Sequence, residues 1–148
     1  MKFLLIPVVV FLFSSAHAEG KLVSYEELRA KHFASIHEIS SCGTWGRGKT
    51  IGEFRLIKAY IDGHAMVFVD MVRPSKDGNS FIVDHGFTFP ELNNEQARIW
   101  LEDISCMPRR KNIVVITAKA EDGHEVKRFR FRITINAKKK RYTYREYR

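Results

Sequence analysis

Apolar residues recur at helical spacing in two segments of the chain. The first begins at Ser24, which forms a capping-box pattern with Glu27, and Val23 precedes it as a hydrophobic staple toward Leu28. One side of the predicted helix then carries Tyr25, Leu28, His32, Ile36 and Ile39. This pattern predicts an N-terminal helix.

The second helical segment begins near Asn93, which forms a capping pair with Gln96, and it ends before Pro108. Its apolar positions follow the i, i+3, i+4, i+7 rule at Ala97, Trp100, Leu101 and Ile104. The sequence therefore predicts a second helix here.

Segments rich in β-branched and aromatic residues predict strands at residues 54–61, 64–72, 80–89, 112–120 and 125–135. Asp62-Gly63 and Asp122-Gly123 are strong hairpin signals between neighbouring strands. Residues 54–61 also fit a helical spacing, so that alternative stays open. Residues 138–148 are either a last edge strand or a tail.

The predicted elements follow the order α-β-β-β-α-β-β, and strands joined by hairpins form antiparallel sheets. We therefore expect an α+β fold. It would contain a single antiparallel sheet of about five to six strands, with the N-terminal helix and the second helix packed on one face. No linker-like stretch divides residues 19–148, which predicts a single domain.

The N-terminal residues 1–18 resemble a secretory signal peptide. Lys2 precedes an unbroken apolar run from Phe3 to Phe13, and Ala16-His17-Ala18 fits the small-x-small cleavage rule. The run is shorter than the ~20 residues that a helix needs to cross a membrane. We expect this segment to be removed and the mature chain to be exported, to the periplasm or out of the cell, without spanning a membrane.

Cys42 and Cys106 are the only cysteines, and an oxidising compartment favours a disulfide between them. In the predicted fold each cysteine follows a helix, so the bond would join the two helix ends. The alternative is a catalytic thiol, but a reactive thiol needs an activating base that the sequence does not place.

The chain of 148 residues carries 25 Lys and Arg against 17 Asp and Glu, a formal net charge of +8. The excess lies after Cys106, because residues 107–148 hold fourteen basic and four acidic residues. Such asymmetry predicts a basic face or tail that favours anionic partners.

Polar and apolar residues alternate cleanly over residues 127–135, so Arg128, Arg130 and Arg132 share one side of the predicted strand. Same-face residues on a strand recur about every 6.6–6.8 Å, which makes a rigid row of guanidinium groups for carboxylates or phosphates. Basic and aromatic residues continue beyond this strand. The candidate binding residues are Arg128, Arg130, Arg132, Lys138, Lys139, Lys140, Arg141, Tyr142 and Tyr144, with Tyr147 as a further aromatic. The alternative is a solvated face that keeps a sheet edge from pairing.

The segment Gly43 to Thr50 satisfies the P-loop pattern G-x-x-x-x-G-K-[ST]. A phosphate-binding P-loop needs a buried strand before it and a helix after it. Residues 37–42 are too polar for that strand, and the segment after Thr50 ends in a hairpin signal. We interpret the segment as a glycine-rich connection, and we expect neither a nucleotide nor another cofactor.

The histidines and carboxylates form no recognisable catalytic or metal-binding motif. His32 and His37 do not share a helix face, so no metal site is predicted. Asp84 and His85 would point to opposite faces of a strand, and no serine lies in a nucleophile elbow. No catalytic residue is assigned, and we do not expect an enzyme.

These observations predict a small exported binding protein without enzymatic activity, of inhibitor or immunity type. It would dock an acidic protein through its basic C-terminal strand. One alternative is a binder of an anionic polymer, such as a glycan, a lipid headgroup surface or a nucleic acid. A second alternative is a small secreted hydrolase.

Overall fold

The computed structural model describes residues 22–94 and 98–147, so the predicted signal peptide lies outside the described residues. Among the residues described, one short helix and a 3₁₀ turn precede eight strands. The elements are α1 (Tyr25–Lys31), η1 (Phe33–Ser35), β1 (Ile36–Arg47), β2 (Thr50–Ile61), β3 (His64–Pro74), β4 (Phe81–Thr88), β5 (Ile99–Arg110), β6 (Ile113–Asp122), β7 (Lys127–Asn136) and β8 (Arg141–Tyr147).

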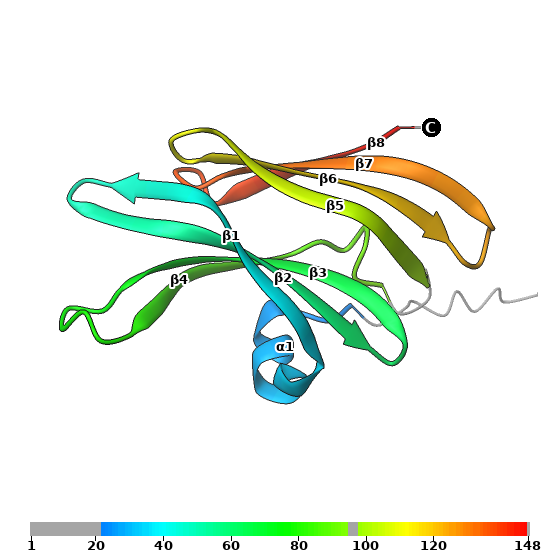
Figure 1. Cartoon of the computed structure of the whole chain (residues 1–148), viewed down its shortest axis with the longest axis horizontal. Helices are drawn as coiled ribbons and strands as arrows, with labels where there is room; N and C mark the ends of the chain where they lie inside the picture. The colour runs from blue at the N-terminus through cyan, green and yellow to red at the C-terminus, as the bar shows by residue number, and fades with distance from the viewer. Residues whose placement is uncertain (1–21, 95–97, 148) are drawn as a thin grey trace, which may run out of the picture.

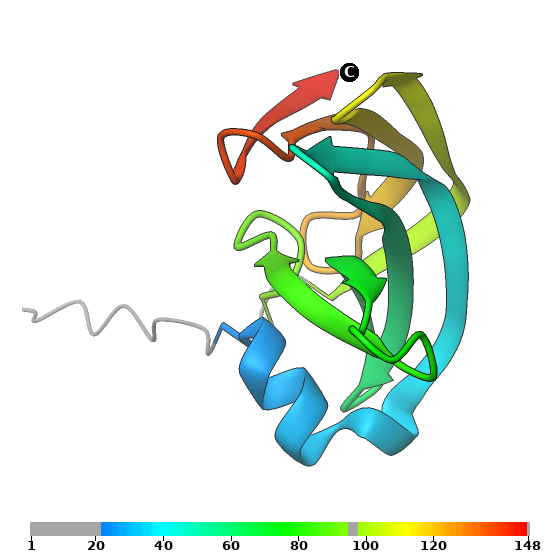
Figure 2. The same ribbon diagram turned by 90° about the vertical axis from the view of Figure 1, so that its left-hand side faces the viewer.

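The strands form two four-stranded antiparallel sheets, ordered β1-β2-β3-β4 and β5-β6-β7-β8. Figure 1 shows one sheet stacked over the other, with α1 beneath the β1–β4 sheet, and Figure 2 shows the same layers from the side. The expected α+β fold with a single sheet is therefore wrong, and the protein is nearly all-β. Each sheet has an apolar face, and the two faces are buried against each other rather than against two helices.

The main hydrophobic core lies between the sheets. Phe54 and Val69 contribute from the β1–β4 sheet, and Ile116, Phe131 and Ile133 contribute from the β5–β8 sheet. Burial of these apolar side chains is the dominant stabilising contribution to a fold of this kind. The outer face of the β5–β8 sheet lies on the other side from this core.

Helix α1 covers the outer face of the β1–β4 sheet. Tyr25 and Leu28 pack there against residues of β2 and β3, including Ile57 and Phe68. The predicted cap is confirmed, because the Ser24 side chain accepts a hydrogen bond from the Glu27 amide at 3.0 Å. The helix ends at Lys31, however, whereas the sequence predicted a longer one.

The last part of the predicted helix is a strand in the structure. Its predicted apolar positions Ile36 and Ile39 lie on β1. Both residues pair with β2, opposite Ala59 and Ile57 respectively. The backbone hydrogen bonds of this segment therefore run to a neighbouring strand instead of along a helix.

The second predicted helix is wrong as well, because its described residues lie on β5. The register of β5 against β6 shifts between Glu102 and Ser105, and Asp103 has a φ of 51°. This bulge changes which alternate residues face the core, so Leu101 and Ile104 both face it although they are three positions apart. A bulged strand thus reproduces the helical spacing.

The predicted cap of that helix has a different role. The Asn93 side chain accepts from the Val67 amide at 2.9 Å and donates to the Val67 carbonyl at 2.6 Å. It therefore extends the hydrogen bonding of β3, as a neighbouring strand would. Gln96 and Ala97 lie outside the described residues.

The predicted hairpins agree with the structure. Asp62 and Gly63 connect β2 to β3, and Asp122 and Gly123 begin the connection between β6 and β7. The open alternatives are also decided, since residues 54–61 lie on a strand and residues 141–147 form the edge strand β8.

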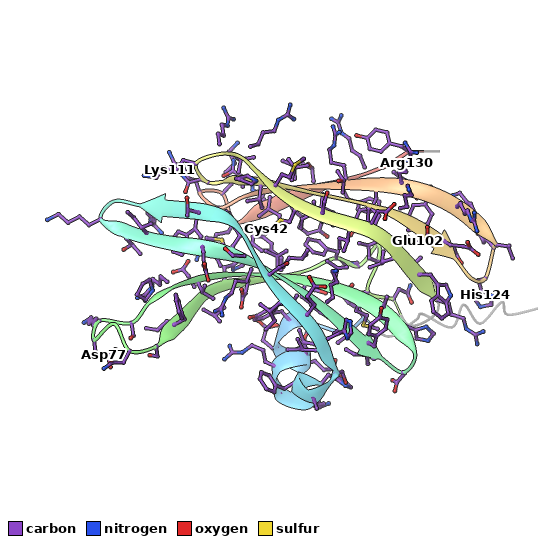
Figure 3. All side chains as sticks on the ribbon, in the orientation of Figure 1. Cys42, Asp77, Glu102, Lys111, His124 and Arg130 are labelled. Carbon is purple, nitrogen blue, oxygen red and sulfur yellow. A yellow bond between two sulfur atoms is a disulfide. The ribbon has the colours of Figure 1, made fainter. Side chains whose placement is uncertain are left out.

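A disulfide joins Cys42 to Cys106, with a Cα–Cα distance of 5.3 Å. The predicted bond is confirmed, but it joins two edge strands, β1 and β5, rather than two helix ends. Figure 3 shows Cys42 in the centre, between the sheets. A structural disulfide is typical of an oxidising compartment outside the cytoplasm. Within residues 22–94 and 98–147, no helix has the length and apolar character needed to cross a membrane.

Candidate functional site

The outer face of the β5–β8 sheet carries the predicted row of arginines. Along β7 the buried Phe129, Phe131 and Ile133 alternate with the exposed arginines Arg128, Arg130 and Arg132. Figure 3 shows the labelled Arg130 on the side of this sheet away from the other one. We call this surface the outer basic face, and we define it by the outward residues of β5 to β8.

Part of this charge is neutralised within the molecule. The Arg128 Nε lies 2.8 Å from a Glu121 carboxylate oxygen, although the arginine side chain is 83% exposed. Lys119 pairs with Asp103 in the same way. In the described part of the chain, Arg130 and Arg132 form no ion pair. Two of the three predicted arginines are therefore available to an outside carboxylate.

The register explains this difference, because cross-strand neighbours decide which arginine finds a carboxylate. Arg128 lies opposite Glu121, whereas Arg130 lies opposite Lys119 on one side and Tyr147 on the other. Arg132 lies opposite Arg145, and like charges in directly opposed positions repel each other. The unpaired charge on β7 therefore begins at Arg130, and Arg145 adds to it beside Arg132.

Large apolar side chains share this face with the arginines. Trp100 lies in one cross-strand row with Glu121 and Arg128, and 59% of this tryptophan is exposed to solvent. Met107 is 59% exposed at the opposite end of β5. Tyr147 lies beside Arg130, and the Arg132 guanidinium carbon is 5.7 Å from the Tyr147 ring centre. The spacing of Trp100 and its apolar neighbours predicted a helix, so the sequence pattern did not place Trp100 on this surface.

Two predicted site residues of β8 lie on the other side of the sheet. Tyr142 packs edge-on against Phe89 and donates a hydrogen bond to a Glu91 carboxylate oxygen at 3.1 Å. Tyr144 stacks on Phe131. Desolvation by burial is the main reason why the pKa of each tyrosine rises to about 12. The alternation along β8 separates them from the outer basic face, to which Arg145 and Tyr147 belong.

The predicted lysines Lys138, Lys139 and Lys140 lie in the turn between β7 and β8, with Arg141 at the start of β8. The three lysines line a cavity of about 610 Å³ at one end of the two sheets, which we call the turn-end cavity. They are therefore separated from the arginine row. The candidate residues of one charged segment thus belong to two surfaces.

Three turns build the turn-end cavity. Arg47, at the end of β1 next to the β1–β2 turn, lines the cavity together with Lys111 of the β5–β6 turn and the lysines of the β7–β8 turn already named. Figure 1 shows these turns at the same end of the molecule. The sequence pattern did not bring Lys111 together with Lys138, because no periodicity links residues of different turns.

Asn112 ties the three turns together from the inside. Its side-chain oxygen accepts from the Gly46 amide at 2.6 Å, and its carbonyl accepts from the Ala137 amide at 2.9 Å. Its own amide donates to the Thr44 carbonyl at 3.4 Å. Asn112 is only 4% exposed and has a φ of 71°, a conformation that asparagine tolerates better than most residues.

One carboxylate borders the cavity. Asp84 lies at a register shift of β4 against β3, and one of its oxygens is 3.1 Å from the Lys140 Nζ. The adjacent His85 lies opposite Met71 and packs edge-on against Phe87. Desolvation by burial, assisted by the Lys140 charge, lowers the pKa of His85 below its ordinary value.

The glycine-rich segment does not have the surroundings of a P-loop. Gly43 to Arg47 is the end of β1, and after the turn the chain continues as the strand β2 from Thr50. Among the described residues, no group of three or more His, Cys, Asp or Glu side chains could hold a metal ion.

Comparison of the chain with protein-family models, with curated proteins and with solved structures found no match. The function is therefore inferred from the residues and surfaces of the chain itself.

Proposed function

We propose that the protein is a small binding protein, exported to the periplasm or out of the cell, that docks an acidic protein through its outer basic face. This role is of the inhibitor or immunity type, in which a rigid surface covers part of another protein. Residues 1–18 serve in this proposal as the signal peptide.

The observation that carries the proposal is the mixture of side chains on this face. Arg130 and Arg132 lie among the exposed Trp100, Met107 and Tyr147. Tryptophan, tyrosine, methionine and arginine are the residues enriched in protein interfaces, and buried aromatic and arginine anchors supply most of their binding energy. Exposed tryptophan and methionine side chains on the same face as unpaired arginines support a protein interface over a purely solvated face.

The outer basic face is also uncovered and rigidly held, and both properties suit binding. The outer face of the other sheet is covered by α1, whereas no described element covers this one. The disulfide and the packed core hold the strands beneath it, so little ordering is required on association.

Arginine substitutions provide the first test. The mature chain, residues 19–148, is used to capture binding proteins from the envelope and secreted fractions of its source cells. The variant R130Q/R132Q should bind a captured partner at least about tenfold more weakly than the unaltered chain. The control R29Q/K76Q removes the same charge from exposed positions elsewhere, and it should retain the affinity. Equal loss in both variants would show that only net charge matters.

The substitution W100A separates a protein partner from an anionic polymer. Loss of an anchoring tryptophan should weaken binding to a protein about tenfold, and the apolar contribution should persist at high salt. A polymer such as heparin should instead show a steep linear fall of log affinity with log salt concentration, with little effect of W100A. The second pattern would favour the polymer alternative over the proposal.

A further inference from the structure

We propose that the turn-end cavity is a separate binding site for a small organic phosphate monoester, in which the lysines receive the phosphate and an apolar body enters below them. This site goes beyond the proposed docking function. It lies at the end of the two sheets, whereas the outer basic face covers one side of the molecule.

The size and base of the cavity suit a small molecule. Its volume of about 610 Å³ lies within the range of about 300–1,000 Å³ typical of ligand sites. Trp45, Met71 and Ala137 line it although each is almost fully buried, so they form its base. The Trp45 indole N–H is already bonded to the Glu53 carbonyl at 3.1 Å, which leaves an apolar ring surface at this base.

The rim of the cavity is cationic and largely unneutralised. Lys140 is paired with Asp84 at 3.1 Å. Within the part of the chain that the structure describes, Lys111, Lys138 and Lys139 have no ion-pair partner. Several ammonium groups held near one another repel, and a dianionic group placed between them removes this repulsion. Lysine is a common ligand of phosphate because its ammonium acts as a compact point charge.

The cations are held by a preorganised frame. Asn112 joins the three turns through the hydrogen bonds to Gly46, Ala137 and Thr44. Lys111 lies directly over Gly46, since a Cβ at that glycine would be 2.9 Å from the Lys111 Cε and 3.3 Å from its Nζ. The absence of a side chain at Gly46 therefore leaves room for this lysine. A frame of this kind reduces the ordering that a ligand must impose.

The ligand class is tested with three probes: phenyl phosphate, inorganic phosphate and phenol. Binding is followed by the amide NMR shifts of Gly46, Gly48, Asn112 and Lys139. Phenyl phosphate should bind saturably and shift these four amides, several-fold tighter than inorganic phosphate, while phenol should not saturate. Equal affinity for phenyl phosphate and inorganic phosphate would overturn the apolar part of the site. Shifts centred on Arg130 and Arg132 would overturn the site as a whole.

Removing positive charge from the cavity and removing negative charge from it should change the affinity for phenyl phosphate in opposite directions. K138Q/K139Q should weaken phenyl phosphate binding at least tenfold, whereas K31Q/K76Q, which removes the same charge from exposed positions outside the cavity, should change it less than twofold. D84N should tighten binding about threefold because it releases Lys140. The lysine changes lie on exposed side chains, and the Asp84 side chain is 30% exposed, so the fold should be kept. Equal effects of the two lysine variants, or weaker binding by D84N, would overturn the proposal.

Two sources of the phosphate are distinguished by vesicles of neutral lipid with and without phosphatidic acid. Sedimentation with the phosphatidic acid vesicles, reversed by phenyl phosphate, identifies a lipid headgroup as the ligand. Saturable phenyl phosphate binding without sedimentation identifies a free small molecule. R130Q/R132Q should leave either result unchanged, so failure of this site and failure of the docking face are separate outcomes.

Discussion

Asn112 offers the sharpest test of how the turn end is held together. Its side chain contributes one acceptor to the buried Gly46 amide, at 2.6 Å, and its backbone occupies a left-handed conformation with a φ of 71°. Substitution by alanine removes the acceptor and places a Cβ-bearing residue without a compensating polar group in that conformation. Substitution by glycine removes only the acceptor, and substitution by aspartate keeps an acceptor oxygen.

The structure sets the expected size of each effect. An unsatisfied buried amide costs about 1–3 kcal/mol, which is the expected loss for N112G. The left-handed conformation adds about 1–2 kcal/mol for a residue other than glycine, so N112A should lose about 2–5 kcal/mol. N112D should lose less than N112A, because its carboxylate still accepts from Gly46 and because Lys111, which lies over Gly46, supplies a counter-charge that offsets its burial.

Urea unfolding with the disulfide intact measures these differences as changes in the free energy of unfolding. N79A is the matched control, since Asn79 is exposed in the turn between β3 and β4 and its loss should matter by less than about 0.5 kcal/mol. Equal stability of N112A and N79A, or an N112D variant as unstable as N112A, would contradict this role of the Asn112 side chain.

Two further predictions concern the disulfide and His85. The C42S/C106S variant should lose about 4 kcal/mol of stability in urea unfolding, because the bond closes a separation of 64 residues; a loss below about 1 kcal/mol would contradict this. The pKa of His85 lies below 6.5, so the unfolded chain takes up the proton first and stability should fall as pH drops below 6.5. K140Q should raise this pKa in an NMR titration, with D62N as the control; an unchanged pKa would show that Lys140 has no influence.

Local patterns predicted the features whose physical causes are local. The Ser24 cap follows from one side chain and an amide three residues later, and the Asp62-Gly63 turn follows from the conformations that these residues accept. The alternation along residues 127–135 likewise predicted which side of β7 carries the arginines. The same alternation on β8 would have placed Tyr142 and Tyr144 away from Arg145, had it been applied there.

The second predicted helix shows where local patterns fail. Leu101 and Ile104 have helical spacing, but the bulge at Asp103 makes that spacing fit a strand. Whether this segment forms a helix or a strand depends on the partner strand β6. The backbone of β6 provides hydrogen-bond partners for the backbone of β5, and its apolar side chains pack against those of β5. The length of α1 was overestimated for the same reason, since Ile36 and Ile39 pair with β2.

The sequence by itself determined the turns, the helix cap, the cysteine pair and the side of β7 that bears positive charge, since each depends on neighbouring residues or on composition. Only the tertiary structure decided that two sheets stack, that Glu121 neutralises Arg128 but not Arg130, and that Lys111 joins the lysines of the β7–β8 turn. Those outcomes depend on contacts between segments far apart in the chain, which hydrophobic burial and strand register select together.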